Sequence, residues 1–391
     1  MSTTKVQEKH AVQTERSATA AVHFADSLHA VLDIEQRVSE MVGIARSEPE
    51  DYLERTWAAG TETSASLYNL PVTRFRAPGL RATFAQATGM AKAGRRVAIF
   101  GSQLDAGAEN LPRTLAPFVA HRLAAERTAE RSAPMFELLA RTPQQAAHFA
   151  LIARKLAELA LVPGVVHSPQ SFAHSLFERV QSPPFEHVKD FLGGPADKIP
   201  TPTAVQQQFF GASRRRLPAW LADDDMPETA LFWHDVLPLC LQTMRVFHEL
   251  TGIEYQLVEA LHAQEAEIIL IATGSHFHFL QENLRKLENK AKTKLGLLHP
   301  TLLRPFPGGL VTQLLQGKKA CLVLSQSHDA NLKSLLRKIR LATDKAFANG
   351  QAAESSALPH PDYPVYKDSS QQPALFSASA AADALAVNEL A

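Results

Sequence analysis

The stretch EIILIATGS, residues Glu267–Ser275, decides the fold class of this sequence. Its aliphatic run predicts a buried strand, and its Thr-Gly-Ser end predicts a tight turn into a helix that continues to Lys290. Two further apolar runs, Leu295–Leu303 and Lys319–Leu324, predict strands on either side of a helix at Gly308–Leu315. The order strand, helix, strand, helix, strand is typical of a doubly wound parallel sheet, so we predict an α/β fold.

The first half of the sequence predicts the same alternation of helices and strands. Thr142 is placed to cap a helix whose first residue is Pro143, a position where proline is tolerated. Gly94 is placed to end the small-residue helix that precedes a short apolar strand. The predicted helices are Ala20–Arg46, Leu80–Lys92, Thr142–Leu161, Phe185–Leu192 and Met226–Leu250, and the clearest predicted strands are Val97–Phe100 and Val162–His167.

The length of 391 residues favours two domains, because one hydrophobic core rarely serves a chain of this size. We predict a flexible arm at 1–19, a first α/β domain at 20–250 and a second at 251–349. Residues 350–391 are rich in Ala, Ser and Pro and show little periodicity, which predicts a disordered tail.

The composition excludes several classes of function. Forty basic residues balance forty acidic ones, so the overall charge gives no reason to expect a nucleic-acid partner. Two cysteines, Cys240 and Cys321, are too few for an iron–sulfur cluster or a Cys-rich zinc site. The sequence contains no membrane-length apolar run and no apolar signal-peptide core at its start, so we expect no membrane partner and a cytoplasmic protein.

The usual nucleotide and redox motifs are absent. The sequence contains no G-x-G-x-x-G, no P-loop and no C-x-x-C. The turn at Gly274 and Ser275 precedes a helix, so its N–H groups can hold an anion, with Arg304 as a second contact. The commoner explanation of such a turn is backbone geometry, which glycine allows.

The histidines predict neither a metal site nor a catalytic group. His276 and His278 lie two residues apart on a predicted helix, which separates their rings, and a metal needs three or four ligands. The other histidines that we considered are scattered along the chain without a nucleophile in a known local frame: His167, His174, His234, His248 and His328. We therefore predict no metal site and no catalytic residue.

Three stretches in the second half carry a family resemblance. They are LTGIEY at 250–255, AEIILIATGS at 266–275 and RPFP at 304–307. In this order and at these spacings, the chain resembles the 2-oxoacid (pyruvate):ferredoxin/flavodoxin oxidoreductases over about residues 80–330. The resemblance implies a thiamine-diphosphate pyrimidine-binding-like domain followed by a transketolase C-terminal-like domain.

The resemblance also implies a divided cofactor site. In that family one domain holds the aminopyrimidine of thiamine diphosphate beside a catalytic Glu. A separate domain holds the diphosphate and Mg²⁺ through a Gly-Asp-Gly motif. No Gly-Asp-Gly occurs in this sequence, so we expect that this chain alone binds no cofactor and that thiamine diphosphate and Mg²⁺ bind only if a partner completes the site.

The family's acid position also lacks a carboxylate. Counting back from Phe100 places it at Leu80 or Arg81, and the candidates to replace it are Glu54 and Glu62. A degenerate copy of the same two domains is found in the N-terminal region of fungal-type sulfite reductase flavoprotein subunits, which this chain resembles in that respect.

Three functions follow as expectations. The first is a non-catalytic scaffold or accessory subunit, as a homo-oligomer or as a hetero-subunit of a redox complex. The alternative is the alpha subunit of a thiamine-diphosphate-dependent 2-oxoacid:acceptor oxidoreductase completed by a partner chain. The last is a regulatory module that binds a small anion at Ser275.

Overall fold

The computed structural model describes residues 22–45, 66–78, 80–101, 116–122, 135–168, 177–194, 235–273, 275–324, 338–339 and 341. The chain divides into two compact units. Unit 1 comprises Met1–Ala124 and Arg131–Tyr255, and unit 2 comprises Ala125–Glu130 and Gln256–Ala391. The predicted arm at 1–19 and the predicted tail at 350–391 lie outside the described residues and stay predictions.

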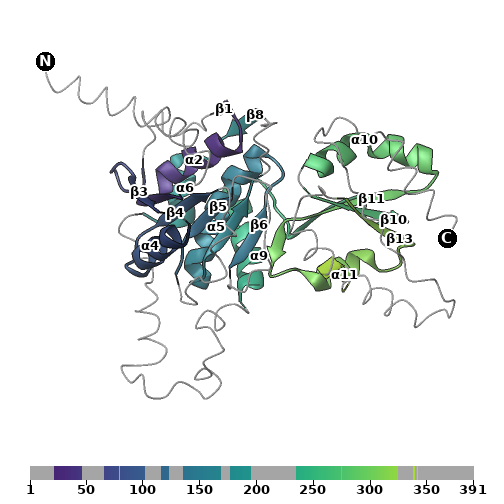
Figure 1. Ribbon diagram of the computed structural model, residues 1–391. Helices are drawn as coiled ribbons and strands as arrows, with labels where there is room; N and C mark the ends of the chain where they lie inside the picture. Colours follow the sequence, from purple (N-terminus) through teal and green to yellow (C-terminus); the bar gives the residue numbers. More distant parts are fainter. Residues whose placement is uncertain are drawn as a thin grey trace, which may run out of the picture. The chain divides into compact units, whose positions relative to one another are not determined.

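Unit 1 is built on a parallel sheet with strands in the order β6-β7-β5-β4-β2-β3 (Figure 1). All of these strand pairs are parallel. A separate antiparallel ribbon pairs β1 with β8. The elements are β1 (Val22–Ala25), α2 (Ser27–Val38), β2 (Met41–Ala45), β3 (Thr73–Ala77), α4 (Leu80–Lys92), β4 (Val97–Gly101), β5 (Val119–Arg122), β6 (Phe136–Leu139), α5 (Pro143–Ala160), β7 (Gly164–His167), β8 (Glu178–Gln181), α6 (Phe185–Leu192) and α9 (Val236–Thr251).

Unit 2 is a smaller α/β unit with a four-stranded sheet in the order β13-β10-β11-β9. β10 is parallel to β11 and β13, whereas β9 is antiparallel to β11. Helices α10 and α11 lie on opposite sides of this sheet (Figure 1). The elements are β9 (Val258–Leu261), β10 (Ile268–Ala272), α10 (Ser275–Ala291), β11 (Leu295–Pro300), β12 (Leu302–Arg304), α11 (Gly308–Leu315) and β13 (Ala320–Leu324).

Several elements are confirmed at their predicted bounds, among them the helices Leu80–Lys92, Phe185–Leu192 and Gly308–Leu315. The cap of α5 is also confirmed, because the Thr142 side chain accepts a hydrogen bond from the Gln145 N–H and Pro143 begins the helix. These elements were predictable because their signals are local: a cap, a proline or one apolar stripe.

The predicted helix at Ala20–Arg46 is wrong. The structure divides the described part of this segment into β1, α2 and β2. Asp26 caps α2 by accepting the His29 N–H, and Ser39 ends α2 in an extended conformation. The three- and four-residue spacing of apolar positions holds inside α2. Beyond it, buried Val42 and Ile44 lie on a strand, so tertiary pairing with β4 overrides the helical pattern.

Two other predicted bounds change and several strands were not predicted. The strand expected at 295–303 is split into β11 and β12, and between them the Thr301 N–H donates to the Leu257 carbonyl. In the described residues the helix expected at 226–250 begins at Val236, and residues 226–234 lie outside them. The unpredicted strands are short: β5, β6, β8 and β9.

A buried polar network joins four elements of unit 1. The Glu35 carboxylate on α2 lies 2.6 Å from His121 Nε2 on β5, 3.0 Å from Arg154 Nη2 on α5 and 2.5 Å from Ser39 Oγ. Arg154 also donates through Nη1 to the Val97 carbonyl at 2.6 Å, where β4 begins. The side chains of Glu35, His121 and Arg154 are fully buried. The network therefore fixes α2 and α5 against one face of the sheet.

The network keeps Glu35 ionised. Burial alone would raise the pKa of this carboxyl, but Arg154, His121 and Ser39 favour the charged form and together lower the pKa of Glu35 to about 2. A buried carboxylate with these partners is stable only while every partner stays in place.

Replacing Glu35 by Gln (Glu35→Gln) should lower the free energy of unfolding by about 3 kcal/mol, because Arg154 is left buried without a counter-charge. Urea unfolding at pH 7, followed by circular dichroism, measures the change. Glu249→Gln is the matched control, since Glu249 pairs with Arg245 on the surface at 3.5 Å and its loss should cost less than about 0.5 kcal/mol. Equal effects of the two substitutions would contradict the role of the network.

The contribution of Glu35 to stability should depend on pH. Its pKa is about 2 in the folded chain and about 4.5 as an ordinary value, so its contribution is complete above pH 4.5 and is lost as the pH falls toward 2. The difference in unfolding free energy between the wild type and Glu35→Gln should therefore shrink between pH 5 and pH 3. A constant difference over this range would contradict the lowered pKa.

Candidate functional site

Two basic side chains end neighbouring strands of the unit 1 sheet. Arg122 is the last residue of β5 and His167 is the last residue of β7. They are paired in register on parallel strands, so their side chains project from the same face at a strand spacing of about 4.8 Å. Both are buried, at 3% and 6% exposure. An arginine and a histidine therefore lie side by side at the carboxyl edge of the sheet.

A carboxylate from the next strand joins them. Glu137 Oε2 on β6 lies 3.2 Å from His167 Nε2. Glu137 is paired with Val165, two residues before His167, which places it on the same face of the sheet. We call Arg122, Glu137 and His167 the edge cluster.

The edge cluster occupies the kind of position where parallel α/β sheets bind ligands, outside the carboxyl ends of the strands. Its face is the one on which α4 packs, because Phe84 of α4 shares a core with Ile99, Ala120 and Val165 of that face. The Glu35 network covers the opposite face of the sheet. His121 points to that face, because it alternates along β5 with Ala120 and Arg122. Chemically, a guanidinium beside an imidazole suits a small oxyanion, and a carboxylate-bound imidazole can hold or release a proton.

The edge cluster was not predicted from the sequence. His167 lies at the end of a predicted strand, but we predicted no role for it. Arg122 and Glu137 lie on strands that were not predicted at all. The available signal was weak: charged residues at the ends of short apolar runs, FVAHR at 118–122 and MFELL at 135–139.

The predicted anion-binding turn stays a prediction. Ser275 begins α10 and Arg304 ends β12, where its side chain is half-buried. Gly274 lies outside the described residues, as does the side chain of Ser275.

The expected loss of the family acid also stays a prediction. Leu80 and Arg81 form the first turn of α4, but their side chains lie outside the described residues, as do Glu54 and Glu62 entirely. Neither β3, with the sequence TRFRA, nor α4, with LRATFAQATGMAK, contains a carboxylate.

His148 on α5 is another buried histidine, and both of its ring nitrogens contact side chains of the protein. Its Nδ1 lies 2.7 Å from the Tyr255 hydroxyl, and its Nε2 lies 2.7 Å from the Gln144 side-chain nitrogen. Its ring packs against Phe247. Burial lowers the pKa of His148 to about 4, so the ring is neutral near pH 7.

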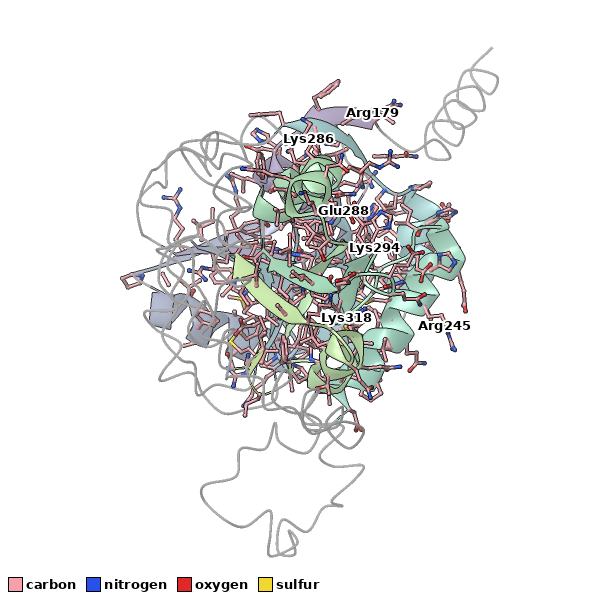
Figure 2. The ribbon with its side chains drawn as sticks, turned by 90° about the vertical axis from the view of Figure 1, so that its right-hand side faces the viewer. Arg179, Arg245, Lys286, Glu288, Lys294 and Lys318 are labelled. Atoms are coloured by element: carbon pink, nitrogen blue, oxygen red, sulfur yellow. The ribbon has the colours of Figure 1, made fainter. Side chains whose placement is uncertain are left out.

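Unit 2 contains an open groove of about 720 Å³ between the C-terminal half of α10 and the amino ends of β10 and β11. Glu288 and Lys294 of this groove are labelled in Figure 2. Its acidic groups have partners within the protein: Glu265 pairs with Lys294 at 3.3 Å, and Glu267 pairs with Lys319 at 2.5 Å. The groove contains none of the predicted site residues.

No metal-binding cluster of three or more His, Cys, Asp or Glu residues occurs in the part of the chain that the structure describes. His278 pairs with Glu282 at 3.3 Å on the surface of α10. Among the described residues no helix is long and apolar enough to cross a membrane.

Comparisons with known proteins found partial similarities to 2-oxoacid oxidoreductases. Residues 266–353 match the family model of pyruvate:ferredoxin oxidoreductase core domain II. Pyruvate synthase subunit PorA of Thermotoga maritima is 27% identical over 211 residues, which cover 51% of this chain and 50% of that protein. PorA of Methanothermobacter thermautotrophicus is 37% identical over 83 residues, or 21% of each chain. Over these ranges the chain is similar to pyruvate:ferredoxin oxidoreductase and to PorA subunits.

A solved structure of 2-oxoglutarate:ferredoxin oxidoreductase from Magnetococcus marinus matches with a TM-score of 0.57 at 16% identity, over 81% of this chain and 60% of that one. This likeness confirms the α/β fold with parallel sheets. The match to the Thermotoga subunit spans half of that protein's length. The predicted similarity to sulfite reductase flavoproteins and the predicted degeneracy stay predictions.

The expectation that thiamine diphosphate and Mg²⁺ need a partner chain stays a prediction, because Glu54 and Glu62 lie outside the described residues. The diphosphate motif is missing from the sequence, and β3 and α4 offer no carboxylate to the pyrimidine. Among the described residues at this edge, the edge cluster offers a guanidinium for an anion and an imidazole that can hold a proton.

The two cysteines take no part in this chemistry. Cys240 on α9 and Cys321 on β13 are buried free thiols, and burial raises the pKa of each to about 12. A thiol at this pKa is almost wholly protonated at pH 7 and is a poor nucleophile.

We expect the native chain to resist a chromogenic disulfide reagent at pH 8 over minutes, because neither thiol is accessible or ionised. In denaturing urea, two thiols per chain should react. Absorbance of the released thiolate measures both reactions, with glutathione as the reactive control. Fast labelling of the folded chain would contradict the buried, protonated state.

Proposed function

We propose that this chain is a subunit of a 2-oxoacid:acceptor oxidoreductase assembly and that Arg122 of the edge cluster binds the carboxylate of the 2-oxoacid. The observation that carries the proposal is a buried guanidinium at the carboxyl edge of the parallel sheet, in a chain related to PorA subunits. A guanidinium can grip a carboxylate through two parallel hydrogen bonds, which fixes both its position and its orientation.

The assembly needs a partner chain. The sequence contains no Gly-Asp-Gly motif, and neither β3 nor α4 contains a carboxylate, so a partner would supply the groups that hold thiamine diphosphate and Mg²⁺. The curated relatives are also named as subunits of pyruvate synthase. A partner that supplies the cofactor would bring it to the carboxyl edge of unit 1, where Arg122 orients the substrate.

A non-catalytic scaffold is the second candidate. It is favoured by the absence of a carboxylate from β3 and α4. In that case the chain supports the assembly and the edge cluster binds no substrate. The two candidates differ in one respect: whether substitution of Arg122 affects turnover of an intact assembly.

The test is purification of the tagged full-length chain from its own host with its partners, followed by 2-oxoacid-dependent reduction of a viologen dye. Arg122→Gln should lower kcat/KM on the order of 100-fold, the size expected when a donor that stabilises an anion is lost. Arg245→Gln is the matched control, because Arg245 is 72% exposed on α9 (Figure 2) and should leave turnover unchanged.

Subunit content and thermal unfolding of each variant assembly show whether it is intact. An intact, active assembly in which Arg122→Gln has no effect would favour the scaffold. Purification without any partner, and no dye reduction in any fraction, would overturn the proposal.

A further inference from the structure

The edge cluster contains a group that the proposed function does not use. His167 is adjacent to Arg122, and within the described residues its ring makes one hydrogen bond, to Glu137 at 3.2 Å. That bond engages Nε2, so Nδ1 is left for another partner. The ring therefore has a fixed orientation and one nitrogen that the described protein does not occupy.

Two charged side chains of the described residues lie on the strands beside His167. Glu137 lies on β6 at one side and Arg122 lies on β5 at the other. Helix α5 packs against β7 from the opposite face, where Arg154 pairs with Glu35 and Glu158 pairs with Arg96 at 2.8 Å. Lys155 is the other charged residue of α5. His121 on β5 also faces away, toward Glu35.

The net charge of the edge cluster thus depends on His167. With a neutral imidazole, Arg122 and Glu137 cancel and the three groups sum to zero. With an imidazolium they sum to one positive charge, and the guanidinium and the imidazolium can both donate hydrogen bonds to an oxyanion. In a buried site, where electrostatic interactions are stronger than in water, this difference decides whether a small anion is attracted.

We infer that His167, oriented by Glu137, is a second and proton-dependent contact for the small oxyanion that Arg122 binds. The ligand class is a small carboxylate such as a 2-oxoacid, or another oxyanion of similar size. The inference rests on the proposed function, because it takes Arg122 as the first contact. Glu137 is a positioning residue in this arrangement, since it acts through His167.

The first test is calorimetric titration of the full-length chain with pyruvate at pH 5.5 and pH 8.0, in the range where histidines commonly change charge. Pyruvate keeps a single negative charge throughout. The wild type should bind about tenfold more tightly at pH 5.5, because hydrogen bonds to charged groups are stronger. Sulfate as a second probe distinguishes a general oxyanion site, which binds both, from a site selective for carboxylates.

The variant His167→Gln should remove the pH dependence while keeping the weaker affinity measured at pH 8.0. His278→Gln is the matched control, because His278 also pairs with a Glu, at 3.3 Å, on the surface of unit 2. It should leave the pH dependence unchanged. Glu137→Gln should reduce the pH dependence, because the neutral amide favours the imidazolium less.

Proton-detected NMR of ¹⁵N-histidine-labelled chain provides a readout that does not depend on variants. Pyruvate should shift the Nδ1 resonance of His167 at pH 5.5 and leave that of His278 in place. One result would overturn this inference and leave the proposed function intact. In that result Arg122→Gln abolishes pyruvate binding, whereas His167→Gln binds pyruvate with the same pH dependence as the wild type. No binding of either anion by the wild type at either pH would overturn the inference, whereas turnover by the assembly tests the proposed function separately.

Discussion

The ion pair between Glu35 and Arg154 is the interaction on which the rest of unit 1 depends. Both side chains are fully buried, and their partners come from α2, α5, β4 and β5. Removing two charges from water is costly, so the arrangement is stable only when each hydrogen bond is made. The pair therefore favours one placement of α2 and α5 on the sheet. Apolar packing alone would specify that placement less strictly.

This constraint also positions the edge cluster. His121 and Arg122 are neighbours on β5 and so point to opposite faces of the sheet. Because Glu35 holds His121 on the sealed face, Arg122 is directed to the other, where β7 and β6 present His167 and Glu137. One residue of slippage in β5 would exchange the two, placing the guanidinium against Glu35 and the imidazole at the edge. A structural network on one face thus specifies a chemical site on the other.

The likeness to the 2-oxoacid:ferredoxin oxidoreductases and the edge cluster are separate observations on the two units. The family model matches residues 266–353, in unit 2, whereas the edge cluster lies in unit 1. The missing diphosphate motif and the absence of a carboxylate on β3 and α4 argue against a site that works in isolation. The proposed role, a subunit that orients an anionic substrate for a partner, would account for both the retained fold and the missing motif.

The sequence by itself determined the fold class, because strands buried on both faces and capped helices leave local signals, as in Glu267–Ser275 and at Thr142. It also carried the family resemblance. It did not reveal that 20–46 contains two strands, because Val42 and Ile44 suit either period until β4 pairs with them. Only the tertiary structure brought Arg122, Glu137 and His167 together. Their spacing in the sequence does not indicate that they are neighbours. The register of the paired strands brings them together.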